Sequence, residues 1–154
     1  MPKTLVVCCD GTWKRADEKD VSNVEKIARS IQLRDPRGEP QIVHYSKGVG
    51  ATGIWLERLL AGALGLGLDD AISDCYRFLA LNFEPGDRIF VFGFSRGAYT
   101  ARSLCGMIDH VGLLTPAGVA GNQLGKANTL YRTRPQAKDR RRQPPEVPEH
   151  TEAL

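Results

Sequence analysis

The stretch IFVFGFSRGAYTARSL, residues 89–104, determines how we interpret the whole chain. An apolar run is followed directly by Ser95, which lies between Gly93 and Gly97, and then by small residues at helical spacing. A serine on a sharp strand-to-helix turn takes a strained backbone conformation, and its neighbours two residues away must be small for the strand and helix to approach. The stretch therefore predicts a nucleophile elbow with Ser95 as the catalytic nucleophile. The alternative is an ordinary strand–turn–helix junction with no chemical role.

Strands and helices alternate along the rest of the chain. Strands are predicted for TLVVCC, QIVHY and DRIFVFGF, at residues 4–9, 41–45 and 87–94, and helices for residues 22–32, 53–65 and 68–83. This alternation predicts an α/β fold of three layers, with a mostly parallel sheet flanked by helices. Because IFVFGF is apolar without alternation, we expect it at the centre of the sheet, buried on both faces.

Two helices have a recognisable buried face. In the helix predicted at residues 22–32, Ser22 is placed to cap the first turn, and an apolar stripe follows at helical spacing. The helix that follows Ser95 shows a second stripe. The first stripe consists of Val24, Ile27, Ala28 and Ile31, and the second of Ala98, Ala101, Leu104, Cys105 and Ile108.

Charge and composition divide the chain at Gly125. With 42% hydrophobic and 25% charged residues, the 154-residue chain resembles an ordinary soluble globular protein. Residues 1–125 contain 14 Lys and Arg against 14 Asp and Glu, whereas residues 126–154 contain 7 against 4. We expect one α/β domain over 1–125 and a basic, proline-rich, disordered tail over 126–154. After Tyr131 no aromatic residue interleaves the basic run, so a nucleic-acid site is not predicted.

The cysteines and the N-terminus indicate a cytoplasmic protein. Cys8, Cys9, Cys75 and Cys105 lack the spacing of a metal site and are interpreted as reduced structural thiols, with the adjacent pair on opposite faces of a strand. The first apolar run meets Asp10 too early for a signal peptide, and no run is long enough for a membrane span. No metal or cofactor is expected.

The turn CCDGTW, residues 8–13, is the second motif with a chemical interpretation. It follows the first strand, so it lies at the carboxyl edge of the sheet, where sites of open α/β sheets form. In α/β hydrolases a loop at this place supplies one backbone N–H of the oxyanion hole, and the residue after the nucleophile supplies the other. Thr12 and Arg96 are the predicted donors, and Gly11 would allow a close approach. The alternative is an Asp-Gly turn without chemical consequence.

A competing motif lies at GVGATG, residues 48–53, which matches the pattern of dinucleotide-binding loops. That fold requires an acidic residue at the end of the next strand to hold the ribose. The next predicted strand ends in Gly93, Phe94 and Ser95. Nucleotide binding is therefore not favoured.

The motifs DGTW, YSKGVGATG and GFSRGAYTARSLCGMIDHVGLL, taken together and in this order, resemble a known family. It is the domain, long catalogued as of unknown function, that is similar to the catalytic domain of type VI secretion phospholipase effectors. The resemblance extends from about Leu5 to Leu114. It implies an α/β-hydrolase fold, a serine esterase or phospholipase activity on lipid or other carboxylic esters, and Ser95 at the position of the nucleophile.

The acid and base of a catalytic triad are not identified by the sequence. Asp109 and His110 follow Ser95 by about 14 residues of one helix, or ~20 Å at 1.5 Å per residue. His150 falls in the predicted tail, and His44 precedes the serine on another strand. We therefore expect the N-terminal part of a hydrolase, truncated and with little activity unless a complementing half is supplied. The alternative is a non-catalytic α/β interaction module that retains the elbow only as architecture.

Overall fold

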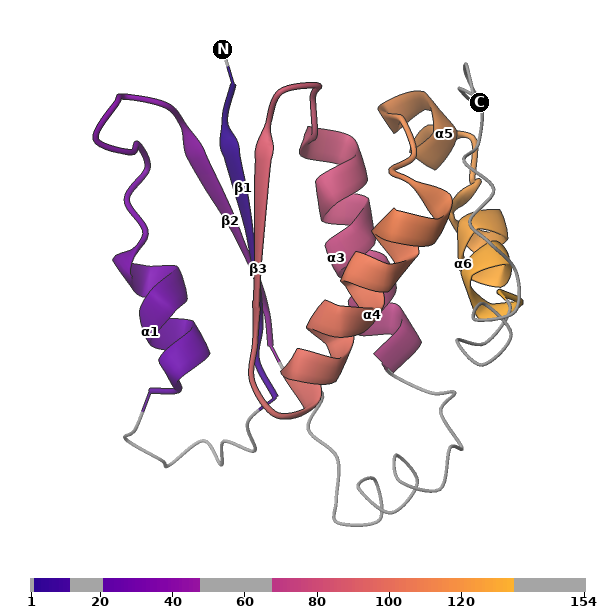
Figure 1. Ribbon diagram of the computed structural model, residues 1–154, viewed down its shortest axis with the longest axis horizontal. Helices are drawn as coiled ribbons and strands as arrows, with labels where there is room; N and C mark the ends of the chain where they lie inside the picture. The colour runs from indigo at the N-terminus through magenta and orange to yellow at the C-terminus, as the bar shows by residue number, and fades with distance from the viewer. Residues whose placement is uncertain (1, 12–20, 48–67, 135–154) are drawn as a thin grey trace, which may run out of the picture.

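The computed structural model describes residues 2–11, 21–47 and 68–134, and shows a mixed α/β fold around a parallel sheet (Figure 1). Within these residues the sheet has three strands, in the order β2-β1-β3. They are β1 (Thr4–Cys9), β2 (Gln41–Ser46) and β3 (Arg88–Gly93), which confirms the three predicted strands. In register, Val6 of β1 lies opposite Val43 of β2 and Phe90 of β3.

Helices lie on both faces of this sheet, as expected for a three-layer arrangement. Helix α1 (Asn23–Ser30) packs against β1 and β2 on one face, and Ser22 caps it as predicted by accepting a hydrogen bond from the Glu25 amide. Helices α3 (Leu68–Asn82) and α4 (Arg96–Val111) cover the other face, and the short α5 (Pro116–Ala120) and α6 (Leu124–Arg132) pack onto them. The helix predicted at 53–65 and the GVGATG motif lie outside the described residues.

The central strand β1 is buried over its whole length. Leu5, Val7 and Cys9 face the main core with α3 and α4, whereas Val6 and Cys8 face a smaller core with α1. Cys8 and Cys9 therefore point to opposite faces, as the alternation of a strand requires. The strand that is apolar and buried on both faces is thus the N-terminal one.

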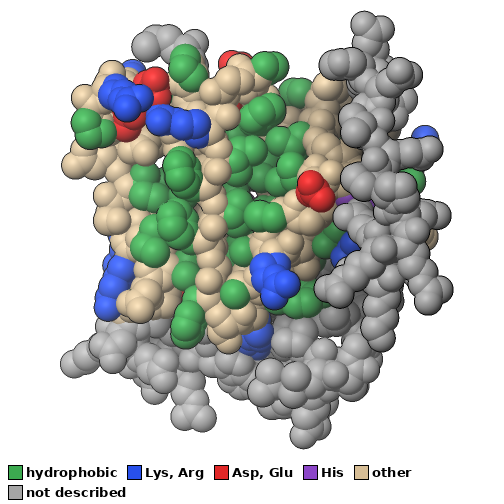
Figure 2. All heavy atoms as spheres, in the orientation of Figure 1, with side chains coloured by type: hydrophobic (Ala, Val, Ile, Leu, Met, Phe, Trp, Pro, Cys, Tyr) green, Lys and Arg blue, Asp and Glu red, His purple; other side chains and the backbone are tan. Residues whose placement is uncertain are grey.

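The position predicted for β3 was wrong, because among the described strands it forms an edge of the sheet and not its centre. Phe90 and Phe92 are 49% and 36% exposed. In register they share the face of Val6 and Cys8, which α1 covers only over β1 and β2. Figure 2 shows hydrophobic side chains on both sides of this edge. An apolar strand without alternation can therefore mark an edge with one face that lacks cover within the described residues, since Ile89 and Val91 on the other face pack against the main core.

Two further expectations need correction. In α4, Ala101 and Leu104 are buried as predicted, but Cys105 is exposed, and Met107 completes the buried face in its place. The boundary expected after Gly125 falls inside α6, whose Ala127 is 2% exposed and belongs to the main core. The folded part thus continues past this boundary. Residues 135–154 of the predicted tail lie outside the described residues.

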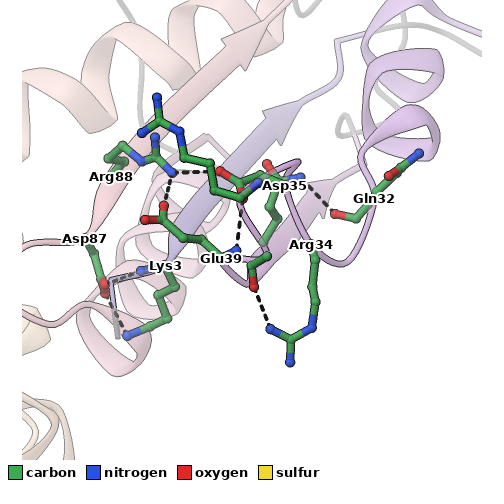
Figure 3. A network of polar contacts seen from close by, with 10 residues as sticks. Lys3, Gln32, Arg34, Asp35, Glu39, Asp87 and Arg88 are labelled. Atoms are coloured by element: carbon green, nitrogen blue, oxygen red, sulfur yellow. Dashed lines mark hydrogen bonds and ion pairs between the residues drawn. The ribbon is translucent and has the colours of Figure 1, made fainter.

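A network of ion pairs joins the amino ends of the strands (Figure 3). Lys3 Nζ lies 2.7 Å from an Asp87 carboxylate oxygen, and Asp87 also accepts a hydrogen bond from the Lys3 backbone amide. Arg88 pairs with Asp35 and Glu39 of the loop before β2. Burial favours a raised pKa for Asp87, but the hydrogen bonds from Lys3 and the Glu84 amide outweigh it and lower that pKa. Since the strands are parallel, this network lies at the end of the sheet opposite to Ser95.

Candidate active site

Ser95 occupies a sharp turn between β3 and α4. It is the N-cap of α4, with φ 54° and ψ −121°, and its hydroxyl makes no capping hydrogen bond. The turn is closed by hydrogen bonds from the Gly97 amide to the Phe94 carbonyl, 2.9 Å, and from the Ala98 amide to the Ser95 carbonyl, 3.0 Å. A positive φ is uncommon for a residue other than glycine, and such conformations cluster at functional sites.

The two glycines flanking Ser95 are required by space. A Cβ on Gly93 would lie 2.5 Å from the Gly97 carbonyl oxygen, and a Cβ on Gly97 would lie 2.0 Å from the Cys9 carbonyl oxygen. Both neighbours are backbone atoms, which cannot rotate away as the tip of a side chain can. The residues at these two positions thus allow β3, α4 and the end of β1 to meet.

Gly11, which follows β1, lies directly against the Ser95 turn. A Cβ on Gly11 would lie 2.4 Å from the Phe94 carbonyl oxygen and 2.6 Å from the Arg96 amide nitrogen. The Gly11 carbonyl accepts hydrogen bonds from Arg96 Nε, 3.1 Å, and Arg96 Nη2, 2.8 Å. The buried Arg96 side chain therefore holds the two turns together, a role that the sequence did not indicate. Thr12, the other predicted oxyanion donor, lies outside the described residues.

Asp10 anchors the same turn from the other side. Its side chain is buried, and its Oδ2 accepts hydrogen bonds from the Tyr45 hydroxyl, at 2.6 Å, and from the Ser22 hydroxyl. Burial, followed by the hydrogen bond to Asp10, raises the pKa of Tyr45. Ser22 caps α1, Tyr45 belongs to β2, and Asp10 directly follows β1. The Asp10 carboxylate therefore links the end of β1, next to Gly11, to both α1 and β2. An acidic residue directly after a buried strand was the available signal for this cluster.

The histidines that the structure describes are remote from Ser95. His44 lies on β2, which β1 separates from β3, and its ring stacks on Phe78 with a centroid distance of 4.9 Å. Asp109 and His110 lie in the last turn of α4, about 20 Å along the helix from its first residue at 1.5 Å per residue. His150 is outside the described residues. Among the described residues, no histidine lies near Ser95, so the base and the acid of a catalytic triad are not identified there.

A cleft of about 800 Å³ begins at Ser95 and follows one face of α4. Tyr99, Arg102 and Asp109 line it along α4, and Tyr131 and Arg134 line it from the end of α6. The Arg134 guanidinium lies 3.6 Å from the centre of the Tyr131 ring. A cleft of this size is in the range of small-molecule sites, which hold roughly 300–1,000 Å³.

Comparison with known proteins identifies the family of the chain. The family model for the T6SS phospholipase effector Tle1-like catalytic domain matches residues 3–153. The chain belongs to this family. The resemblance inferred from the motifs is thereby confirmed, and the Tle1-like match includes β1, the Ser95 turn and α6.

One curated relative of the Tle1-like chain comes from Saccharomyces cerevisiae. The uncharacterised protein YEL023C is 37% identical over 126 residues, which is 73% of this chain and 18% of the yeast protein. The chain therefore spans about a fifth of the length of the curated relative that it matches. No solved structure matches the chain. In the described residues, none of the helices is long and apolar enough to cross a membrane.

Proposed function

We propose that this Tle1-like chain is a serine hydrolase domain that cleaves carboxylic esters of lipids, with Ser95 Oγ as the nucleophile. The observation that supports the proposal is the backbone of Ser95 at a strand–helix junction, whose φ of 54° and ψ of −121° are a strained conformation of the kind that a nucleophile elbow requires. Glycine is required on each side of Ser95, because a Cβ at Gly93 or Gly97 would lie only 2.5 or 2.0 Å from a backbone oxygen. Membership of a phospholipase family supports the same chemistry.

In this proposal the tetrahedral oxyanion is stabilised by backbone amides. The Arg96 amide opens α4, where the helix dipole favours negative charge. Gly11 brings the loop after β1 against the elbow, so that the Thr12 amide would be the second donor. The base that removes the Ser95 proton and the carboxylate that orients it would come from residues beyond those described.

The cleft along α4 suits a phospholipid substrate. Arg102 lies two helical turns from Ser95, and Arg134 faces the same cleft. A guanidinium group binds phosphate oxygens with paired hydrogen bonds, so these two arginines would hold the phosphate while the ester lies at Ser95. Under this proposal, Arg102→Ala should weaken the binding of a phospholipid to the chain more than the binding of a short uncharged ester.

The open edge of β3 is the surface on which we place a complementing half of the hydrolase. Phe90, Phe92 and Phe94 are 36% to 53% exposed along this edge, and the chain matches only 18% of its yeast relative. A further parallel strand paired to β3, with a helix over Phe90 and Phe92, would cover these side chains and continue the sheet. We expect the isolated chain to self-associate, because open strand edges and exposed apolar patches promote association.

A fluorophosphonate probe tests the nucleophile. We expect weak labelling of the isolated chain that disappears in Ser95→Ala and persists in the control Ser30→Ala, an exposed serine at the end of α1. Loss of any one triad member leaves only about 10³–10⁴-fold catalysis over water, so ester turnover by the chain alone should be negligible. Labelling unchanged in Ser95→Ala would refute the assignment of the nucleophile.

A corresponding substitution in the yeast relative distinguishes the hydrolase from the alternative, a non-catalytic interaction module. The longer yeast relative provides the test, with its residue at the position aligned with Ser95 replaced by alanine. Esterase activity that this change removes supports the hydrolase. An inactive yeast protein whose residue aligned with Ser95 does not react with the probe would favour the interaction module.

The role of the β3 edge is tested in the chain itself. Phe90→Lys combined with Phe92→Lys should reduce self-association, and an unchanged oligomeric state would contradict that role.

A further inference from the structure

Two buried cysteines face each other below the Ser95 turn. Cys9 is the last residue of β1, and Cys75 lies on α3, 66 residues further along the chain. Their sulfur atoms are 3.9 Å apart, and both residues are at most 1% exposed. All four cysteines are free thiols in the structure. Neither Cys9 nor Cys75 has a part in the proposed ester hydrolysis.

Two polar residues of β2 complete this cluster. In register, Val7 pairs with His44 and Cys9 pairs with Ser46, so both β2 residues lie on the face of the sheet that α3 covers. Hydrogen bonds from Cys9, His44 and Ser46 lower the pKa of Cys75, although burial acts in the opposite direction. The His44 pKa is raised, chiefly by its hydrogen bond to Cys75. In this cluster the His44 imidazole stabilises the thiolate of Cys75, and the Cys9 thiol is in contact with the same sulfur atom.

We propose that Cys9 and Cys75 are a redox modification site that closes to a reversible disulfide, with His44 as the group that accepts the Cys75 proton. With a peroxide as oxidant, the Cys75 thiolate attacks one peroxide oxygen, giving a sulfenic acid and water. The Cys9 thiol then displaces the sulfenic hydroxyl as a second water and forms the S–S bond. Two thiols are oxidised and one peroxide is reduced. A thiol such as glutathione reverses the step by exchange.

The geometry favours this pair over the other cysteines. The sulfur atoms must approach by about 1.9 Å to reach the bonding distance of ~2.05 Å. Cys8 has the same burial as Cys9 but faces α1 on the opposite side of the sheet. Cys105 is exposed on α4. Cys8 is therefore the control for a thiol that is equally buried but has no partner thiol across the same face. Cys105 is the control for a thiol that is accessible to the oxidant.

The bond would act on the candidate active site through the backbone of Cys9. The Cys9 carbonyl oxygen accepts a hydrogen bond from the Phe94 amide, and the same oxygen is the atom nearest to a Cβ placed on Gly97. A disulfide to α3 would therefore fix the end of β1 on which the Ser95 turn rests. This consequence goes beyond the proposed hydrolase, and the covalent test below does not depend on any esterase activity.

The test is oxidation of the full chain with hydrogen peroxide, followed by alkylation, tryptic digestion without reduction and mass spectrometry. A disulfide would join the peptide of residues 4–14 to that of residues 59–77. Because Cys8 and Cys9 share the first peptide, the experiment is repeated in Cys8→Ser. We expect the linked peptides in the wild type, Cys8→Ser and Cys105→Ser, and their loss in Cys9→Ser and Cys75→Ser.

Folding and the role of His44 are checked separately. The link should form in the native chain and be lost from Cys9→Ser even when circular dichroism shows a native spectrum. It should also raise Tm by roughly 10 °C, as expected from closing a loop of this length. At a pH no higher than the Cys75 pKa of about 5, His44→Gln should slow link formation by up to about tenfold per unit rise in that pKa. A link that forms only in urea, or through Cys8 or Cys105, would overturn the proposal, and an unchanged rate in His44→Gln would overturn the role of the imidazole.

Discussion

Gly97→Ala is the most direct test of how the Ser95 turn is held. Its new Cβ would lie 2.0 Å from the Cys9 carbonyl oxygen and 2.5 Å from the Cys9 carbonyl carbon. Ordinary contact begins at 3.4 Å, so α4 and β1 would have to separate by about 1.4 Å. The same movement would break the hydrogen bond of 3.2 Å from the Phe94 amide to Cys9.

The energetic cost of that movement can be bracketed. Overpacking a well-packed site costs typically about 1–3 kcal/mol, and contact with fixed backbone places Gly97→Ala at the upper end. Replacing glycine by alanine in a helix returns up to about 1 kcal/mol. We therefore expect the free energy of unfolding to fall by about 2 kcal/mol or more.

Gly125→Ala is a matched control, because Gly125 is also the second residue of its helix, α6, and has no atom within 4 Å of a new Cβ. It should stabilise the chain by about 0.5–1 kcal/mol. The assay is urea unfolding followed by circular dichroism. Stability should increase in the order Gly97→Ala, wild type, Gly125→Ala. A Gly97→Ala chain as stable as the wild type would refute the argument that Gly97 is required by contact with β1.

Three further substitutions test other parts of the structure. Ser95→Gly should raise the free energy of unfolding by about 1 kcal/mol, because it relieves roughly 1–3 kcal/mol of backbone strain at a small entropic cost, and urea unfolding that shows a loss would contradict the strained turn. Tyr45→Phe removes the hydrogen bond to the buried Asp10 carboxylate and should cost ~1–2 kcal/mol in the same assay, with no change as the contrary result. The lowered pKa of Asp87 means that its ionised form stabilises the fold above its unfolded pKa of about 3.9 and that this contribution is lost as pH falls through the folded value. Asp87→Asn should therefore lower Tm at neutral pH and flatten its decline below about pH 4, and parallel Tm curves for both proteins would exclude this role.

Local signals predicted most of the elements. The three strands, the Ser22 cap of α1 and the glycines around Ser95 follow from short-range patterns, since each depends on neighbours within about four residues. The sheet order does not. The sequence IFVFGF is equally apolar at a centre or at an edge, and which of its faces is covered depends on where α1 packs.

The polar clusters around the site were missed for a related reason. The contacts of Asp10 with Tyr45, and of Cys9 with Cys75, depend on the pairing of β1 with β2 and on the docking of α3. In sequence these partners are 35 and 66 residues apart. Arg96 illustrates the same point, because its backbone amide could be predicted from the motif, whereas the hydrogen bonds of its side chain to Gly11 required the two turns to be in contact.

The contact between Gly11 and Arg96 also constrains when a newly synthesised chain can acquire its site. The two residues are 85 positions apart, so the hydrogen bonds between them cannot form until translation has passed α4. At about 5–20 residues per second, several seconds separate the synthesis of the two turns. During that interval β1 can already pair with β2 and bury Val6 and Cys8 against α1. The contact between the two turns can thus form only after synthesis of β3, at a time when β1 and β2 can already be paired.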